Sequence, residues 1–188
     1  MTDKIVLGLV GEIASGKSAV AEFLEKEFNS ETASFSQPLR DILDILNLPQ
    51  SRENMVWLGV DLRERFGQDI LAKAVLNMVK KSQAAMICLP NIRLEGDINL
   101  LGTLPYFYLI KIKADAQIRY QRLRKRGENT DDATKTWEEF LNDANLPTEV
   151  TIREVGKQAQ FTVKNDTSED DLIKQIKEVI LQIKRRVK

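Results

Sequence analysis

The sequence contains no histidine and a single cysteine, and each scarcity excludes a class of chemistry. Without histidine, the chain can build neither a Ser-His-Asp triad nor the usual imidazole metal site. With Cys88 alone it can form no disulfide within the chain and no zinc cluster. Catalysis must therefore use carboxylates, arginine, lysine or a hard cation, and a reducing compartment, the cytoplasm, is the expected location.

An excess of charge of either sign is also lacking. Lys plus Arg and Asp plus Glu both total 28, so the formal net charge is zero. No global field draws such a chain to nucleic acid or to an anionic membrane. No stretch approaches the roughly 18 apolar residues of a membrane span, and we find no signal peptide. We therefore expect a soluble cytoplasmic protein that binds neither nucleic acid nor membrane, with any anion site being local.

Five short apolar runs alternate with segments of helical periodicity. The runs cover residues 4–10, 32–35, 84–89, 106–112 and 159–163. This alternation predicts a parallel α/β sheet, and the length of 188 residues suits a single domain, 1–188. Helix starts are predicted at Ser36, at Thr136, which forms a capping-box pattern with Glu139, and at Ser168.

One segment carries a specific phosphate-binding pattern. Gly11-Glu12-Ile13-Ala14-Ser15-Gly16-Lys17-Ser18 matches Gly-x4-Gly-Lys-Ser/Thr, in which backbone N–H groups converge on a phosphate. Lys17 is expected to bind the β- and γ-phosphates, and the Ser18 hydroxyl to coordinate Mg²⁺. Glu12 either points away from this cradle or meets a cation. The pattern predicts ATP or a related nucleotide, with Mg²⁺, bound by Gly11, Ala14, Ser15, Gly16, Lys17 and Ser18.

Three arginines have helical spacing. Arg119, Arg122 and Arg126 are spaced i, i+3, i+7, which places them on one face of a helix. Like charges this close repel unless an anion joins them, and phosphoryl transfer needs positive charge around the moving group. The alternative is a solvated basic face near the end of a helix.

Beyond the P-loop, the chain resembles the adenylate-kinase-like nucleoside monophosphate kinases, and more closely the dephospho-coenzyme A kinase-like branch with its uncharacterised archaeal and bacterial relatives. The likeness is carried by residues 34–40, 62–67, 90–93 and 119–140, and by Asn165-Asp166. The resemblance implies a three-layer α/β/α P-loop fold with a five-stranded parallel sheet in the order 2-3-1-4-5. It also implies a small helical lid over about residues 119–140. Within it, the polar composition of residues 127–135 predicts a mobile loop, which suits a moving lid.

The same resemblance implies an ATP-dependent phosphotransferase that moves the γ-phosphoryl group to a small phosphorylated acceptor, with a nucleoside or deoxynucleoside monophosphate favoured. The acceptor phosphate would be gripped by Arg40 and Arg93, with Arg63 as a third candidate. Taken singly, each of these arginines could instead form a surface salt bridge. The implied contacts to the transferring group are Lys17 together with Arg122 and Arg126 of the lid.

The chain departs from the resemblance at two places. Relatives usually carry an Asp that helps to hold Mg²⁺ before the Gly-x-Arg of the third strand, where this chain has Pro90. Dephospho-coenzyme A kinases carry an Asp after the second strand, where this chain has Ser34 and Ser36. Two alternatives therefore stay open: a dephospho-coenzyme A kinase-like enzyme, and a nucleotide-binding regulatory module with little transfer activity.

Overall fold

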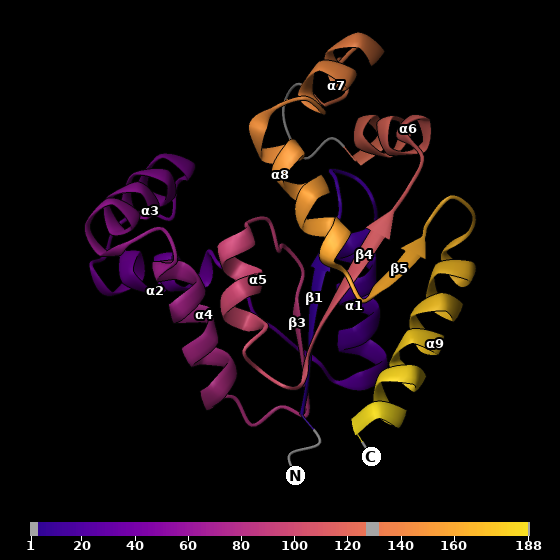
Figure 1. Ribbon diagram of the computed structural model, residues 1–188. Coiled ribbons are helices and arrows are strands. Elements are labelled where there is room, and N and C mark those ends of the chain that lie inside the picture. The colour runs from indigo at the N-terminus through magenta and orange to yellow at the C-terminus, as the bar shows by residue number, and fades with distance from the viewer. Residues whose placement is uncertain (1–3, 127–131, 188) are drawn as a thin grey trace.

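A computed structural model of the chain describes residues 4–126 and 132–187. Its five strands form one parallel sheet in the order β2-β3-β1-β4-β5, so the predicted fold class and strand order are confirmed. Because the strands are parallel, their carboxyl ends meet at one edge, the upper edge in Figure 1. The strands are β1 (Ile5–Val10), β2 (Glu31–Thr32), β3 (Met86–Leu89), β4 (Phe107–Lys113) and β5 (Phe161–Lys164).

Helices cover both faces of the sheet, which gives three layers (Figure 1). One face carries α1 (Lys17–Phe28) and α9 (Glu169–Val187). The opposite face carries α4 (Ile70–Lys81), α5 (Glu95–Leu101) and α8 (Pro147–Val155). The remaining helices of the described residues are α2 (Gln37–Ile45), α3 (Arg52–Phe66), α6 (Ala116–Arg126), α7 (Trp137–Asp143) and the 3-10 turn η1 (Gly156–Gln158).

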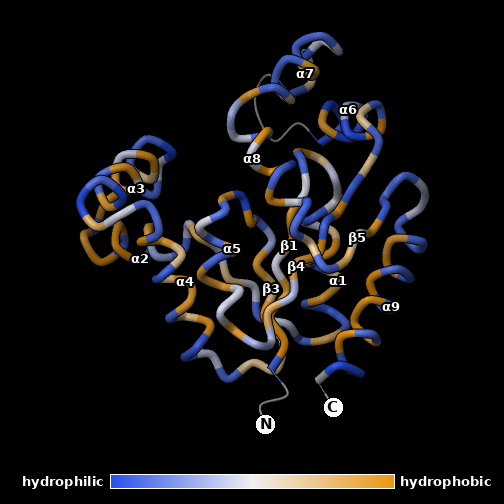
Figure 2. The backbone as a smooth tube through the Cα atoms, in the orientation of Figure 1, coloured by the Kyte–Doolittle hydropathy of each residue, from blue (hydrophilic) through white to orange (hydrophobic). Residues whose placement is uncertain are grey.

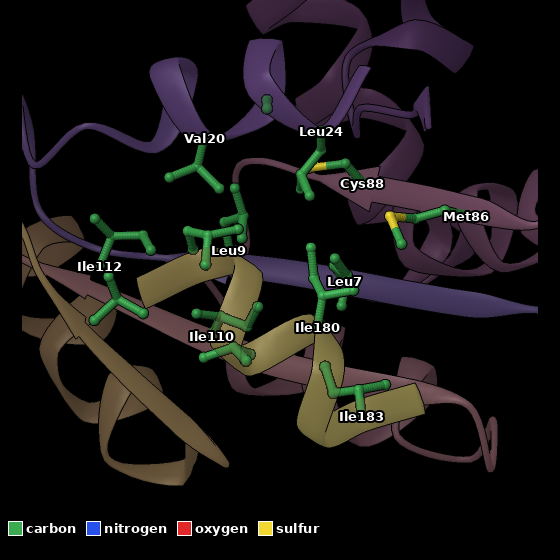
Figure 3. Packing of buried hydrophobic residues seen from close by; sticks show 14 of the residues in the cluster. Leu7, Leu9, Val20, Leu24, Met86, Cys88, Ile110, Ile112, Ile180 and Ile183 are labelled. Atoms are coloured by element: carbon green, nitrogen blue, oxygen red, sulfur yellow. The ribbon is translucent and has the colours of Figure 1, made fainter. Parts of the chain in front are cut away.

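The central strand β1 is buried along its whole length because it is covered on both faces. Alternate side chains of a strand point to opposite faces, so Leu7 and Leu9 pack against α1 and α9. Figure 3 shows this cluster, in which Leu7 and Leu9 lie among Leu24 and Ile180. Val6 and Val10 point to the opposite face and pack against α4, α5 and α8. A continuous apolar run is therefore what this strand requires.

Two of the predicted helix starts have the expected side-chain caps. Thr136 and Glu139 form the predicted capping box before α7, with the Glu139 N–H donating to Thr136 Oγ1 at 3.2 Å. At the start of α9, the Asp171 N–H donates to Ser168 Oγ at 3.2 Å. Along α9, apolar and polar residues alternate with helical periodicity, as the colours of Figure 2 show, so that one side faces the sheet.

A smaller apolar cluster lies beside the main core. It joins α2, α3 and α4 through Leu39, Leu43, Leu58 and Leu71, and Phe35 packs against both this cluster and the core. The α2–α3 pair thereby stands to one side of the carboxyl edge of the sheet (Figure 1). Among the described helices, none combines the length and apolar character that a membrane crossing demands.

Candidate functional site

The P-loop joins the carboxyl end of β1 to the start of α1, and its two glycines are required by their surroundings. A Cβ on Gly11 would lie 2.3 Å from the carbonyl oxygen of Ile112 on β4. Gly16 has φ +104°, and a Cβ there would lie 2.1 Å from Nδ2 of Asn165. Because no side chain fits at either position, the loop can turn tightly and expose its backbone N–H groups.

Lys17 follows the loop and folds back over it. Its Nζ donates to the carbonyl oxygens of Gly11 at 2.6 Å and of Glu12 at 3.0 Å. Burial lowers the pKa of Lys17 to about 8; the nearby Glu149 carboxylate opposes this shift, while Arg93 and other arginines add to it. The ammonium is therefore set among charges of both signs, at the point where the P-loop pattern places phosphates.

A cavity of about 350 Å³ lies over the P-loop, here called the phosphate cavity. Of the residues predicted for the nucleotide, it brings together Gly11, Ala14, Lys17 and Ser18, and it adds Arg93 and Arg126. Ser15 is 1% exposed and Gly16 supports the turn, so these two shape the loop from beneath. The other lining residues are Ile13, Asn91, Ile92, Glu149 and Ile152.

A second cavity, of about 630 Å³, adjoins the first and is here called the acceptor cavity. Asn91 and Arg93 line both cavities, so the two share a wall. Arg63 lines the acceptor cavity, and so does Arg52, which the sequence interpretation had not singled out. Its apolar wall comes from Phe35, Leu39, Met55, Val56, Val60 and Leu71.

Arg40 lies outside both cavities. It is exposed on α2, where its Nη1 donates to Gln50 Oε1 at 3.2 Å. This partner is a neutral amide and not the carboxylate of a surface salt bridge, and the role of Arg40 at an acceptor stays a prediction. Arg93, in contrast, is held in place through its backbone, because Asp97 Oδ2 accepts from the N–H groups of Arg93 at 3.4 Å and Leu94 at 3.1 Å.

Comparison with known proteins places this arrangement in context. No family model matches the chain. A UPF0200 protein from Methanocaldococcus jannaschii is 27% identical over 188 residues, covering 95% of this chain and 90% of the relative. A UPF0200 protein from Pyrococcus abyssi is 25% identical over 186 residues, covering 95% of this chain and 97% of the relative.

Among solved structures, the shikimate kinase from Bacteroides thetaiotaomicron has a TM-score of 0.60 at 12% identity, with 94% of this chain and 98% of that chain covered. The shikimate kinase from Acinetobacter baumannii, in complex with shikimate, has a TM-score of 0.56 at 17% identity, with 96% and 95% covered. The chain has the fold of the P-loop kinases. This agrees with the resemblance derived from its sequence.

Within this P-loop kinase fold, the three arginines of α6 have three different surroundings. Arg119 is only 5% exposed and forms an ion pair with Glu12, Nη2 to Oε1 at 3.3 Å, while its guanidinium stacks on the Phe140 ring. Arg122 donates from Nη2 to Asn165 Oδ1 at 3.1 Å and does not line the phosphate cavity. Arg126 does line it. Of the three, Arg126 is the one that lines the phosphate cavity in this structure, and the contacts of Arg122 and Arg126 to a transferring group stay predictions.

Glu12, whose orientation the sequence left open, meets two cations. Besides Arg119, its Oε1 pairs with Arg153 Nη1 of α8 at 3.4 Å. The acidic residue in the loop is thus neutralised from outside the cradle, and α6 and α8 are both tied to the P-loop. On the other side, Asn165 Nδ2 donates to the Ser15 carbonyl at 2.9 Å and links the loop to the end of β5.

The lid predicted over residues 119–140 corresponds to most of α6 and the start of α7, which pack together through aromatic rings. Tyr120 contacts Trp137 with ring centroids 5.3 Å apart, and Trp137 stacks on Phe140 at 5.6 Å. Trp137 therefore packs against aromatic rings of the segment predicted to be a lid. Of the loop predicted to be mobile, residues 127–131 lie outside the described residues.

Two functional candidates on α8 escaped the sequence interpretation. Glu149 lines the phosphate cavity, and Arg153 pairs with Glu12. Neither belongs to a local pattern with known chemistry. The sequence did contain one signal: Leu146-Pro147, followed closely by Glu149, is typical of a helix start with an acidic first turn. That signal does not indicate which residues Glu149 or Arg153 contact.

Proposed function

We propose that the protein is an ATP-dependent phosphotransferase that moves the γ-phosphoryl group of ATP to a small phosphorylated acceptor. The observation that carries the proposal is the shared wall between the phosphate cavity and the acceptor cavity, made by Asn91 and Arg93. A protein that only bound nucleotide would have no use for a second cavity meeting the first at an arginine. Bringing two reactants side by side is the main catalytic resource in phosphoryl transfer.

The chemistry of the acceptor cavity favours a molecule with an anionic group and an apolar or planar body. Arg63 and Arg93 would bind the anion, and Arg52 adds a third cation to the lining. The wall that includes Phe35 and Met55 suits the planar part. A nucleoside or deoxynucleoside monophosphate has both features, and so does the nucleotide end of a coenzyme A precursor.

In the proposed reaction, Lys17 exchanges its two carbonyl acceptors for β- and γ-phosphate oxygens. Arg126 adds positive charge where negative charge develops on the moving group. Ser18 offers an oxygen ligand for Mg²⁺, an ion that neutralises phosphate charge when bound with the nucleotide. Positioning and electrostatics, rather than a covalent intermediate, supply the rate.

The test is a coupled assay with ATP, Mg²⁺ and a panel of acceptors: the nucleoside and deoxynucleoside monophosphates, dephospho-coenzyme A, and shikimate as a hydroxyl acceptor without phosphate. We expect transfer to at least one phosphorylated acceptor, faster than hydrolysis of ATP by water. Tight ATP binding with no transfer to any of them would replace the kinase proposal with the binding-module alternative. Transfer to shikimate alone would show that the acceptor class is wrong.

A further inference from the structure

Glu149 is a carboxylate in an unusual place. Among the described residues that line the phosphate cavity it is the only acidic side chain, and the others include Lys17, Arg93 and Arg126. Its Oε2 atom is buried and has no hydrogen-bond partner within the described part of the chain. A buried acceptor left without a donor costs free energy, and a bound water, ligand or ion is the usual partner of such a group in a native fold.

The fold holds this carboxylate firmly. Glu149 lies in the first turn of α8, and its backbone N–H donates to the Leu146 carbonyl at 3.0 Å. A carboxylate in this first turn also interacts favourably with the positive end of the helix dipole. Farther along α8, Ile152 and Val155 are 5% and 1% exposed and pack into the core. Glu149 is therefore carried by a rigid element rather than by a free loop.

A triphosphate in this cavity would change the charges around Glu149. Among the charged groups around Lys17, Glu149 acts most strongly on the ammonium, and in the nucleotide complex the ammonium donors would turn to the phosphates. Glu149 would then face several phosphate charges, and like charges a few ångström apart in a partly dry site repel strongly. A cation between the carboxylate and the phosphates removes the conflict.

Mg²⁺ suits this position because it takes oxygen ligands and is commonly held by one or two carboxylates together with substrate phosphates and water. Ser18 lines the same cavity and offers its hydroxyl. No group of three or more acidic, histidine or cysteine side chains that could hold a metal alone exists among residues 4–126 and 132–187. The ion would thus be bound jointly with the nucleotide.

We propose that Glu149 and the Ser18 hydroxyl together hold the Mg²⁺ of the bound nucleotide, so that a carboxylate from α8 takes the place of the one missing at Pro90. The inference rests on the proposed nucleotide site. It assigns a metal ligand to α8, whereas the carboxylate that the resemblance leads one to expect would lie at the end of the third strand, where this chain has Pro90.

The test measures nucleotide affinity by calorimetry with a non-hydrolysable ATP analogue, in Mg²⁺ and in EDTA. Three proteins are compared: wild type, Glu149→Gln, and the matched control Glu154→Gln, which alters an exposed glutamate on the same helix. We expect Mg²⁺ to strengthen binding to wild type and to the control alike. Glu149→Gln should lose about tenfold or more of this Mg²⁺ gain, the size typical of a disturbed metal site. In EDTA it should bind as tightly as wild type or tighter, because a repelling charge is gone.

A direct readout is the binding of Mn²⁺ together with the same analogue, measured by electron paramagnetic resonance. The affinity for Mn²⁺ should fall in Glu149→Gln and should be retained in part in Glu149→Asp. An unchanged Mg²⁺ gain and unchanged Mn²⁺ binding in Glu149→Gln would overturn the assignment. The assignment would also be overturned if Glu149→Gln kept its metal dependence but lost the acidic limb of the pH–rate profile of phosphoryl transfer. Glu149 would then act as a proton acceptor. If wild type bound the analogue in neither condition, the nucleotide site itself would be wrong, which is a different failure.

Discussion

The protonation of Lys17 makes the charge of the P-loop depend on pH. Its pKa is about 8, well below the ordinary 10.5, chiefly because burial disfavours the ammonium form. Phosphate binding favours that form, so the nucleotide complex should have a higher Lys17 pKa than the free protein. Nucleotide affinity should therefore be constant below about pH 8 and fall by up to about tenfold per pH unit above it, with proton uptake on binding in that window.

Calorimetry between pH 7 and pH 9.5, in two buffers of different ionisation enthalpy, measures both the affinity and the proton uptake. Lys17→Arg serves as the control, because a guanidinium stays protonated throughout this range. The nucleotide affinity of this variant should therefore not depend on pH. A wild-type affinity that stays flat up to pH 9.5, with no proton taken up, would contradict the expected shift.

Gly16 is the residue at which the backbone of the P-loop is most demanding. In Gly16→Ala, the alanine would have to adopt the φ of +104° that Gly16 has, and its Cβ would collide with the Asn165 amide. The left-handed conformation alone costs about 1–2 kcal/mol, and the collision adds to it. We expect a lowered melting temperature and loss of nucleotide binding.

The matched glycine is Gly96, where a Cβ would meet nothing within 4 Å in the first turn of α5. Gly96→Ala should stabilise the protein by about 0.5–1 kcal/mol, since alanine is the better helix former, and should leave nucleotide binding intact. If both variants behaved alike in a thermal melt, the strain assigned to Gly16 would be wrong.

At single residues, the sequence predicted what is local and missed what is distant. The P-loop residues Gly11, Lys17 and Ser18 follow from an eight-residue pattern, and all three line the phosphate cavity. The pairing of Arg153 with Glu12 joins positions 141 apart in the chain, so only the complete fold brings the two side chains together. Arg40 fails to reach a cavity because α2 turns its side chain outward, which a one-dimensional pattern does not encode.

Among the elements, α6 and α8 are joined to the P-loop by one carboxylate. Glu12→Ala would leave Arg119, whose side chain is 6% exposed, as a buried cation without its acidic partner. Breaking a buried pair by removing one partner costs of the order of 3 kcal/mol. A denaturant titration should show this loss, and the helices that close the phosphate cavity should become more accessible in hydrogen exchange.

The control for this element is Glu154→Ala on α8. Its salt bridge with Lys157 is exposed, with side chains 61% and 68% accessible, and such pairs contribute less than about 1 kcal/mol. A cost for Glu12→Ala no larger than for Glu154→Ala would mean that the P-loop is not anchored through Glu12.

The helix α3 offers a matched pair of arginines for testing the acceptor cavity. Arg63 lines the cavity, whereas Arg65, two residues on, is exposed and does not. Removing a charged hydrogen bond to a bound phosphate costs about 1.5–3 kcal/mol, so Arg63→Ala should raise the acceptor KM at least about tenfold. Arg65→Ala should leave it unchanged, and neither variant should alter the KM for ATP. Equal effects of the two variants on acceptor KM would remove Arg63 from the site.

For whole elements, the alternation of apolar runs and helical periodicity was enough to predict the parallel sheet and its helices. It was less exact at β2, expected at residues 32–35 and observed as Glu31–Thr32. The Ala33 N–H still donates to the Cys88 carbonyl of β3, but Ser34 and Phe35 leave the sheet to begin the wall of the acceptor cavity. The site role of α8 could not be predicted, since a helix that contributes one side chain to a distant cavity carries no periodic sign of it.

Across the whole molecule, the neutral net charge conceals an uneven distribution. Lysine and arginine balance the acidic residues in number, yet Lys17, Arg93 and Arg126 converge on one cavity in which Glu149 is the acidic lining residue. Helices α6 to α8 stand over the carboxyl edge of the sheet, and α2 and α3 stand beside it (Figure 1). A neutral composition is therefore compatible with a local cluster of cations, and the absence of a general attraction to polyanions stays a prediction.

This distribution predicts that stabilisation by nucleotides follows their phosphates. A ligand at 100 times its dissociation constant stabilises the folded state by about 2.7 kcal/mol. For a chain of this size, each kcal/mol raises the melting temperature by about 2–4 °C, so ATP with Mg²⁺ should shift it by about 5–10 °C. Adenosine has no phosphate for the cavity cations and should give no comparable shift. Lys17→Ala should melt as wild type does or slightly higher, because it removes a buried charge, but should lose most of the ATP shift. Equal shifts from adenosine and ATP, or a full ATP shift in Lys17→Ala, would place the nucleotide site elsewhere on the molecule.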